Sequence, residues 1–162
     1  MSTEKMDKFD VVIPGFEAME GVELVQKLPL FRTLTFDETR ALFAIARPVT
    51  KAKGEVIIEE DSFGSALFIV RKGRVRIERR GTLLGTRGVG EILGEMSLVD
   101  DVLTSADVIA DDGGAELLMI PRRDFEGLLQ RDPPLALKVY KAFCRTLSER
   151  LRTTNDIKGG VH

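Results

Sequence analysis

Between residues 47 and 121 the chain divides its apolar residues into short runs separated by turns that contain glycine. Runs such as 56–58 and 66–70 are shorter than an ordinary helix and rich in branched aliphatic side chains, as strands are. Turn signals separate them, including those at 72–73 and 112–114. Many short strands with frequent turns predict a small sandwich or barrel.

The strand prediction is supported by local alternation. Val75 and Ile77 alternate with charged residues, which is the pattern of a half-exposed strand. The runs 108–110 and 117–120 lie on either side of the glycine pair at 113–114, and they are expected to form the closing pair of strands.

The segment before the predicted barrel has a helical pattern. Residues 16–28 carry apolar side chains at steps of three, and Pro29 stops that helix. A second helix is expected to start at Thr35, because Thr35 and Glu38 have the spacing of a capping box. It is expected to turn four side chains toward a core: Leu42, Phe43, Ile45 and Ala46.

Two further helices are predicted after the barrel. The first covers 122–130, and the second covers about 133–152, with Asp132 as its cap. The second helix carries one apolar stripe: Ala136, Tyr140, Phe143, Leu147 and Leu151. The polar residues 153–162 are predicted to be a disordered tail.

Composition narrows the functional classes. A length of 162 residues suits one domain, and the net charge of −2 gives no general attraction to DNA or to a membrane surface. The chain has one cysteine, Cys144, and one histidine, His162. These counts exclude an intrachain disulfide and most histidine-based catalytic or metal sites. The N-terminus has no apolar secretory segment. We therefore expect a soluble, cytoplasmic protein that has no metal site and is not an enzyme.

The segment 90–98, followed by Ser105-Ala106, resembles the phosphate-binding cassette of cyclic-nucleotide-binding domains. The order of helices, strand-rich barrel and two helices is similar to that family over about residues 27–152. This resemblance implies an α+β, mainly β fold, in which a small barrel or jelly roll is flanked by N-terminal helices and two C-terminal helices. Residues 1–26 would be a partly helical extension.

The resemblance also implies a binding site. A cyclic phosphate suits the backbone amides at the start of a short helix. Gly94 would allow a close backbone approach, and Glu95 would accept a hydrogen bond from the ribose 2′-hydroxyl. The implied ligand-binding residues are Gly94, Glu95, Met96, Ser97, Leu98, Thr104, Ser105 and Ala106. The ligand would be cAMP or cGMP, with no other cofactor.

Thr104 departs from the family pattern, because that position holds the arginine that grips the cyclic phosphate. A guanidinium binds phosphate with charge-assisted bonds of roughly 1.5–3 kcal/mol each. Loss of one such bond weakens binding by about ten- to a hundredfold. Asp100, Asp101 and Asp107 add negative charge nearby. One of three arginines could compensate: Arg74, Arg76 or Arg87.

Two functions follow. The first is a regulatory cyclic-nucleotide sensor that signals through its C-terminal helices, and the second is a ligand-independent protein-interaction module of the same fold. Helix 133–152 would join two copies in a homodimer or bind a partner protein. About ten residues follow Arg152, so we expect a stand-alone bacterial-type member without a helix-turn-helix domain and without direct DNA binding.

Overall fold

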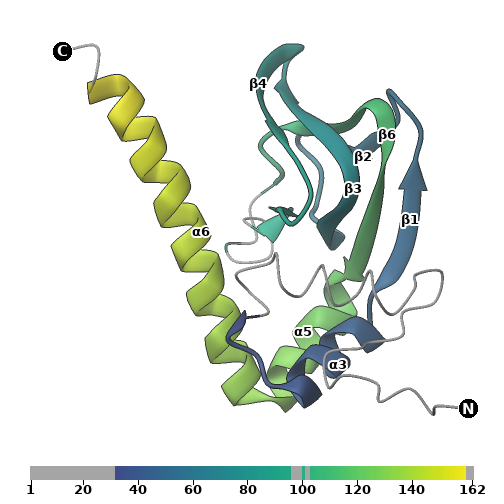
Figure 1. Cartoon of the computed structure of the whole chain (residues 1–162), viewed down its shortest axis with the longest axis vertical. Coiled ribbons are helices and arrows are strands. Elements are labelled where there is room, and N and C mark those ends of the chain that lie inside the picture. The colour runs from purple at the N-terminus through teal and green to yellow at the C-terminus, as the bar shows by residue number, and fades with distance from the viewer. Residues whose placement is uncertain (1–31, 96–99, 101–102, 160–162) are drawn as a thin grey trace, which may run out of the picture.

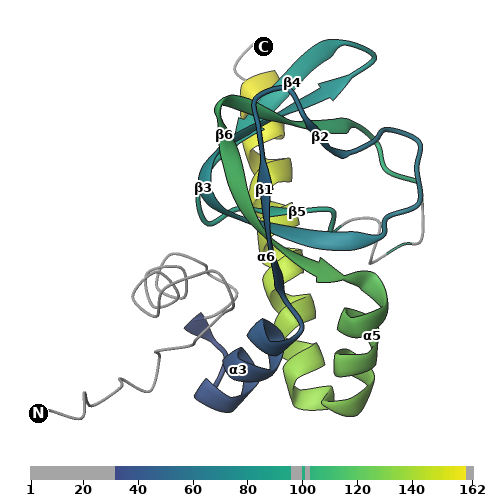
Figure 2. The same ribbon diagram turned by 90° about the vertical axis from the view of Figure 1, so that its right-hand side faces the viewer.

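A computed structural model describes residues 32–95, 100 and 103–159, and the side chains up to residue 154. It contains an antiparallel sheet that wraps around a common interior, with helices at one end and along one side (Figures 1 and 2). The elements are α3 (Phe36–Ala44), β1 (Arg47–Lys51), β2 (Val56–Ile58), β3 (Ala66–Arg79), β4 (Thr82–Arg87), β5 (Ile92–Leu93), β6 (Asp107–Pro121), α5 (Arg122–Arg131) and α6 (Pro133–Gly159). The predicted fold class is confirmed.

The sheet is built around two long strands, β3 and β6, which pair from Ala66 opposite Pro121 to Glu78 opposite Asp107. β1 and β2 pair with β6, while β4 and β5 pair with β3. The sequence prediction of turns at 72–73 and 112–114 was wrong, because both segments lie inside these strands. They are bends, where the register between β3 and β6 shifts.

Glycine is required at these bends because the backbones come very close. Gly73 and Gly114 have φ angles of +83° and +76°, and side-chain-bearing residues rarely adopt such angles. A Cβ atom on Gly73 would lie 2.2 Å from the carbonyl oxygen of Gly114, and one on Gly114 would lie 2.6 Å from that of Lys51. The glycines therefore mark kinks in continuous strands, which explains why sequence patterns mistake them for turns.

The alternation of side chains along β3 divides the core in two. Leu67 and Ile69 pack with the helices, while Phe68 and Val70 point into the barrel. The helical cluster includes most of the residues predicted to face inward, with Ile45 packed against it, and these are Leu42, Phe43, Ala46, Phe125, Leu128 and Leu129. Both faces of β3 are thus buried over residues 66–70, which holds the barrel and the helices in one unit.

The N-terminus of α3 is tied to α6. The predicted capping box is confirmed: Glu38 N donates to Thr35 Oγ1 at 3.1 Å, and Thr35 N donates to Glu38 Oε1 at 2.8 Å. Lys138 of α6 also donates to Glu38 Oε1, at 2.6 Å. Burial raises the pKa of Glu38, but the bonds from Lys138 and Thr35 outweigh it, so this pKa lies below its ordinary value.

The last helix is longer than predicted. Asp132 caps it as expected, with Leu135 N donating to Asp132 Oδ1 at 3.2 Å. It continues to Gly159, so the prediction that 153–162 is a disordered tail was wrong for 153–159. The predicted helix 16–28 and the extension 1–26 lie outside the described residues.

We predict that Glu38→Gln destabilises the protein by about 1 kcal/mol at neutral pH, because the charge that holds Lys138 is lost. Since folding lowers the pKa of Glu38, its contribution is present above about pH 4.3 and is lost as the pH falls through the folded value. Urea unfolding should therefore separate the two proteins at pH 7 and bring them together near pH 3. Asp37→Asn, an exposed change in the same turn, is the matched control. A gap that persists in acid, or an equal effect of Asp37→Asn, would contradict this account.

Candidate functional site

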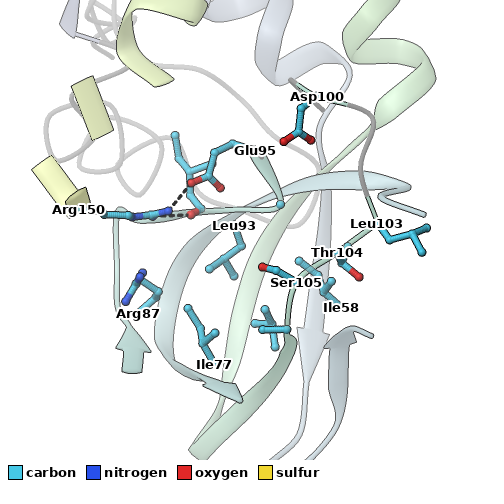
Figure 3. Close-up of a pocket in the computed structure, with 14 residues that line it drawn as sticks. Ile58, Ile77, Arg87, Leu93, Glu95, Asp100, Leu103, Thr104, Ser105 and Arg150 are labelled. Carbon is cyan, nitrogen blue, oxygen red and sulfur yellow. Dashed lines mark hydrogen bonds and ion pairs between the residues drawn. The ribbon is translucent and has the colours of Figure 1, made fainter. Parts of the chain in front are cut away.

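A cavity of about 270 Å³ lies between the barrel and α6 (Figure 3). Its apolar wall is formed by residues of the strands β2, β3, β5 and β6 and by Leu103. The strand residues are Ile58, Ile77, Ile92, Leu93 and Val108. Its ionisable residues are Arg87, Glu95, Asp100 and Arg150. The cavity therefore combines an apolar wall with a few charged groups, as small-molecule sites commonly do.

The turn after β5 places Glu95 in the cavity wall. Gly94 has a φ of +86°, and a Cβ atom on it would lie 2.8 Å from the carbonyl oxygen of Ala66. Any other residue would be strained there and would also push β3 away. Glu95, directly after this turn, is only 2% exposed. The chain thus buries a carboxylate at the edge of the cavity, where sequence analysis placed the ribose-binding residue.

The buried carboxylate is paired with the C-terminal helix. Arg150 of α6 donates through Nη1 to Glu95 Oε1 and forms an ion pair with it. Its Nη2 donates to the carbonyl oxygen of Ile92 at 3.1 Å. A buried carboxylate needs such a partner, because an unpaired charge in this position is costly. Sequence analysis missed Arg150, since the helical pattern located it on α6 but gave no sign that it reaches the cassette.

Arg87, at the end of β4, is the second cationic side chain in the cavity wall. Its Nη1 donates to the carbonyl oxygen of Thr86 at 2.9 Å, and its Nε lies 3.9 Å from Glu91 Oε1. The Nε is buried and has no hydrogen-bond partner. Burial lowers the pKa of this guanidinium, and the positive charge of Arg150 lowers it further.

Thr104 lines the cavity, but its hydroxyl group is bonded to the loop after β2. The hydroxyl donates to the carbonyl oxygen of Glu59 and accepts from the Ser62 amide at 3.0 Å. Its backbone amide donates to the Ser62 carbonyl oxygen at 2.9 Å. The side chain is 6% exposed. Thr104 therefore joins two loops, and its one hydroxyl hydrogen is already used.

The other predicted site residues divide into two groups. Ser105 and Ala106 line the cavity, with the Ser105 carbonyl oxygen accepting from Arg79 Nε at 2.8 Å. Met96, Ser97 and Leu98 lie outside the described residues.

Of the three arginines considered as substitutes for the missing one, Arg87 alone lines the cavity. Arg76 is 3.4 Å from Glu78 and 3.7 Å from Asp111, and Arg74 is exposed on β3.

The comparisons with known proteins identify the class. The model of the cyclic nucleotide-binding domain matches residues 48–132, and the chain belongs to that family. It is 32% identical over 126 residues to a cyclic AMP receptor protein of Thermus thermophilus, covering 75% of this chain and 58% of that one. It is 30% identical over 164 residues to the Pycsar effector protein PaPycTIR of Pseudomonas aeruginosa, covering all of this chain and 50% of that one. The chain thus spans little more than half the length of these relatives.

The fold comparison agrees. A solved cyclic nucleotide-binding domain from Methylobacillus flagellatus superposes with a TM-score of 0.73 at 24% identity, covering 85% of this chain and 80% of that one. Among the described residues, no helix has the length and apolar character needed to cross a bilayer.

We predict that Thr104→Val destabilises the domain by about 1–3 kcal/mol, because the Glu59 carbonyl oxygen and the Ser62 amide lose their partner. Thr104→Ser keeps the hydroxyl and removes only a methyl group, so its cost should stay near 1 kcal/mol or below. Thermal unfolding of the two variants beside the unaltered protein measures the difference. If Thr104→Ser were the more damaging change, the hydroxyl would not be the group that matters.

Proposed function

We propose that the cavity binds a cyclic mononucleotide and that the chain acts as a regulatory sensor module, with a binding role and no catalytic one. The observation that carries this proposal is the buried carboxylate of Glu95, held on the Gly94 turn beside a cavity of about 270 Å³ in a domain of this family. The name of the Thermus thermophilus relative, a cyclic AMP receptor protein, supports the ligand class.

In the proposed complex the ribose hydroxyl donates to Glu95 while Arg150 keeps its bond to Oε1. A carboxylate offers about four lone-pair sites on its two oxygens, so it can accept from both groups. A neutral hydroxyl cannot replace the guanidinium as the partner of a buried charge. Ligand and α6 would therefore share Glu95 and stabilise each other.

Because the ligand and α6 would share Glu95, binding in the cavity would be coupled to the docking of α6 on the barrel. If ligand binding strengthens the docking of α6, the docking of α6 must strengthen ligand binding by the same factor. A partner that pulls α6 away from the barrel would then release the ligand. In this proposal the C-terminal helix carries the signal because the Glu95 carboxylate accepts hydrogen bonds from both the ligand and Arg150.

The phosphate would lie toward Ser105 and Ala106, at the end of the cavity where Thr104 replaces the arginine. Among the described residues that line this end, none carries a positive charge, and Asp100 is negative. Phosphate recognition would depend on backbone amides, so affinity for cAMP and cGMP should be lower than an arginine would give, by about ten- to a hundredfold.

Calorimetry with cAMP, cGMP and their 2′-deoxy analogues tests the proposal. Glu95→Gln and Arg150→Gln should each weaken binding by about tenfold, since each removes a charge-assisted bond. The 2′-deoxy analogues should bind the unaltered protein about tenfold less tightly, and this difference should be smaller in Glu95→Gln, whose amide oxygen accepts a weaker, neutral hydrogen bond. Arg152→Gln, an exposed change on the same helix, should leave binding unchanged.

Two results would contradict the sensor. One is the absence of heat with every nucleotide, and the other is tight binding that ignores both the 2′-hydroxyl and Glu95. The first result would favour the alternative, a ligand-independent interaction module, which the fixed Thr104 hydroxyl already supports.

We further propose that α6 joins two copies of the chain. Its exposed face carries a seam that we define as Leu137, Tyr140, Cys144, Leu147 and Leu151. These positions alternate at steps of three and four residues, which is the spacing of a two-stranded coiled coil. Leu137 and Leu151 are 58% and 62% exposed. A second copy would cover the seam along its full length.

The seam differs from the stripe that sequence analysis identified. Phe143 is only 1% exposed, and Ala136 packs against the buried cluster, so both belong to the face that packs in the core. The sequence of α6 places apolar residues on two neighbouring faces of the helix. Which face is exposed is decided by the packing of α6 against α3 and α5.

We predict that Leu151→Glu raises the dimer dissociation constant by tenfold or more, because a charge would be buried in the seam. Leu83→Glu is the matched control, since Leu83 is 56% exposed but lies on β4. Sedimentation equilibrium measures both. An unaltered protein that stays monomeric at high concentration, or equal effects of the two changes, would rule out the seam.

A further inference from the structure

We propose that Arg87 reads the base of the bound nucleotide and selects bases with a carbonyl oxygen, guanine and uracil, over bases with an amino group in the corresponding place, adenine and cytosine. This inference rests on the proposed function of the cavity. It concerns a residue outside the cassette, at the end of β4.

Arg87 and Ser105 stand at opposite ends of the cavity. Arg87 pairs with Val75 of β3, whereas the Ser105 carbonyl oxygen accepts from Arg79 at the other end of that strand. Four residues of strand separate Val75 from Arg79, which is roughly 13 Å. Figure 3 shows Arg87 below Arg150 on one side of the cavity, with Thr104 and Ser105 on the other.

This separation fixes which part of a nucleotide faces Arg87. With the phosphate at Ser105 and the ribose hydroxyl at Glu95, the base extends along the apolar wall of Ile77 and Leu93. The remaining end of the cavity is the one that Arg87 occupies. Arg87 is thus placed to meet the edge of the base rather than the phosphate.

The chemistry of Arg87 sets the preference. A guanidinium has only donors, so it can pair with carbonyl oxygens and ring nitrogens but not with an amino group. Its Nη1 is held by the Thr86 carbonyl oxygen and its Nε is buried near Glu91, so the donors available to a ligand are the remaining N–H groups of the guanidinium. The charged groups around it are Glu91 at 3.9 Å, Arg150 and Glu95, and Glu95 is already paired with Arg150. A ligand acceptor would pair with those N–H groups, whereas an amino group would set a donor against a donor.

The size of the preference follows from known base recognition. Guanine offers two neighbouring acceptors, O6 and N7, to an arginine, while adenine replaces O6 by an amino donor. One good contact of this kind discriminates between bases by about 10- to 100-fold. Glutamine, which both donates and accepts, suits the adenine edge instead.

Calorimetry with cGMP, cUMP, cAMP and cCMP tests the inference on the whole chain. The unaltered protein should bind the first two about 10- to 100-fold more tightly than the last two. Arg87→Gln should abolish this preference mainly by weakening cGMP and cUMP, and Arg74→Gln, a change of an exposed arginine of β3 outside the cavity, should preserve it. A melting curve of Arg87→Gln shows whether the variant is folded, and the selectivity of the unaltered protein needs no variant at all.

The outcomes separate the two proposals. Binding of all four nucleotides without preference, or a preference that Arg87→Gln leaves intact, overturns the inference while the sensor function stands. An equal loss of all four nucleotides in a folded Arg87→Gln variant also overturns it and assigns Arg87 to the phosphate. If the unaltered protein binds none of the four, the proposed function fails and the inference fails with it.

Discussion

The ion pair between Glu95 and Arg150 is the contact on which the arrangement of the site depends. Glu95 is almost fully buried beside the cavity, and a carboxylate in that position is tolerable only with a charged partner. The partner comes from α6, which otherwise packs on α5 and α3 at the far end of the barrel (Figure 1). One pair of side chains therefore joins the cavity to the helix that carries the exposed seam.

The charges of the cavity are unevenly distributed, and this distinguishes the chain from the family pattern. Both guanidinium groups in its wall, those of Arg87 and Arg150, lie at the end away from Ser105. Thr104, which sequence analysis assigned to the position of a phosphate-binding arginine, uses its hydroxyl to bond the loop after β2. The buried carboxylate and the turn that holds it are present, and the two guanidinium groups that line the cavity lie on its Glu95 side.

Sequence analysis recovered the features that local chemistry determines. The capping box at Thr35, the cap at Asp132 and the buried faces of α3 and α5 are each decided within a few residues, and each is confirmed. The two glycine bends were misassigned, because a glycine in a kinked strand and a glycine in a turn look alike until the neighbouring strand is known. Arg150 could not be found, since a contact across 55 residues leaves no periodic signal.

The pocket shows the same division between local and long-range information. Gly94 and Glu95 were identified because the cassette motif places them next to each other, and both line the cavity. The partners of the Thr104 hydroxyl lie on a loop about 42 residues earlier in the chain, so no local pattern could show that this hydroxyl is already bonded. The position of Arg87 in the cavity wall likewise depends on which face of β4 is turned inward, and only the pairing with β3 decides that.

Hydrogen exchange along α6, with and without a saturating cyclic nucleotide, tests the central claim most directly. If ligand and helix share Glu95, the amides around Arg150 should exchange more slowly in the complex, and Arg150→Gln should abolish this slowing at full saturation. Binding that leaves exchange in α6 unchanged, or slows it equally in Arg150→Gln, would show that the buried ion pair does not connect the cavity to the helix.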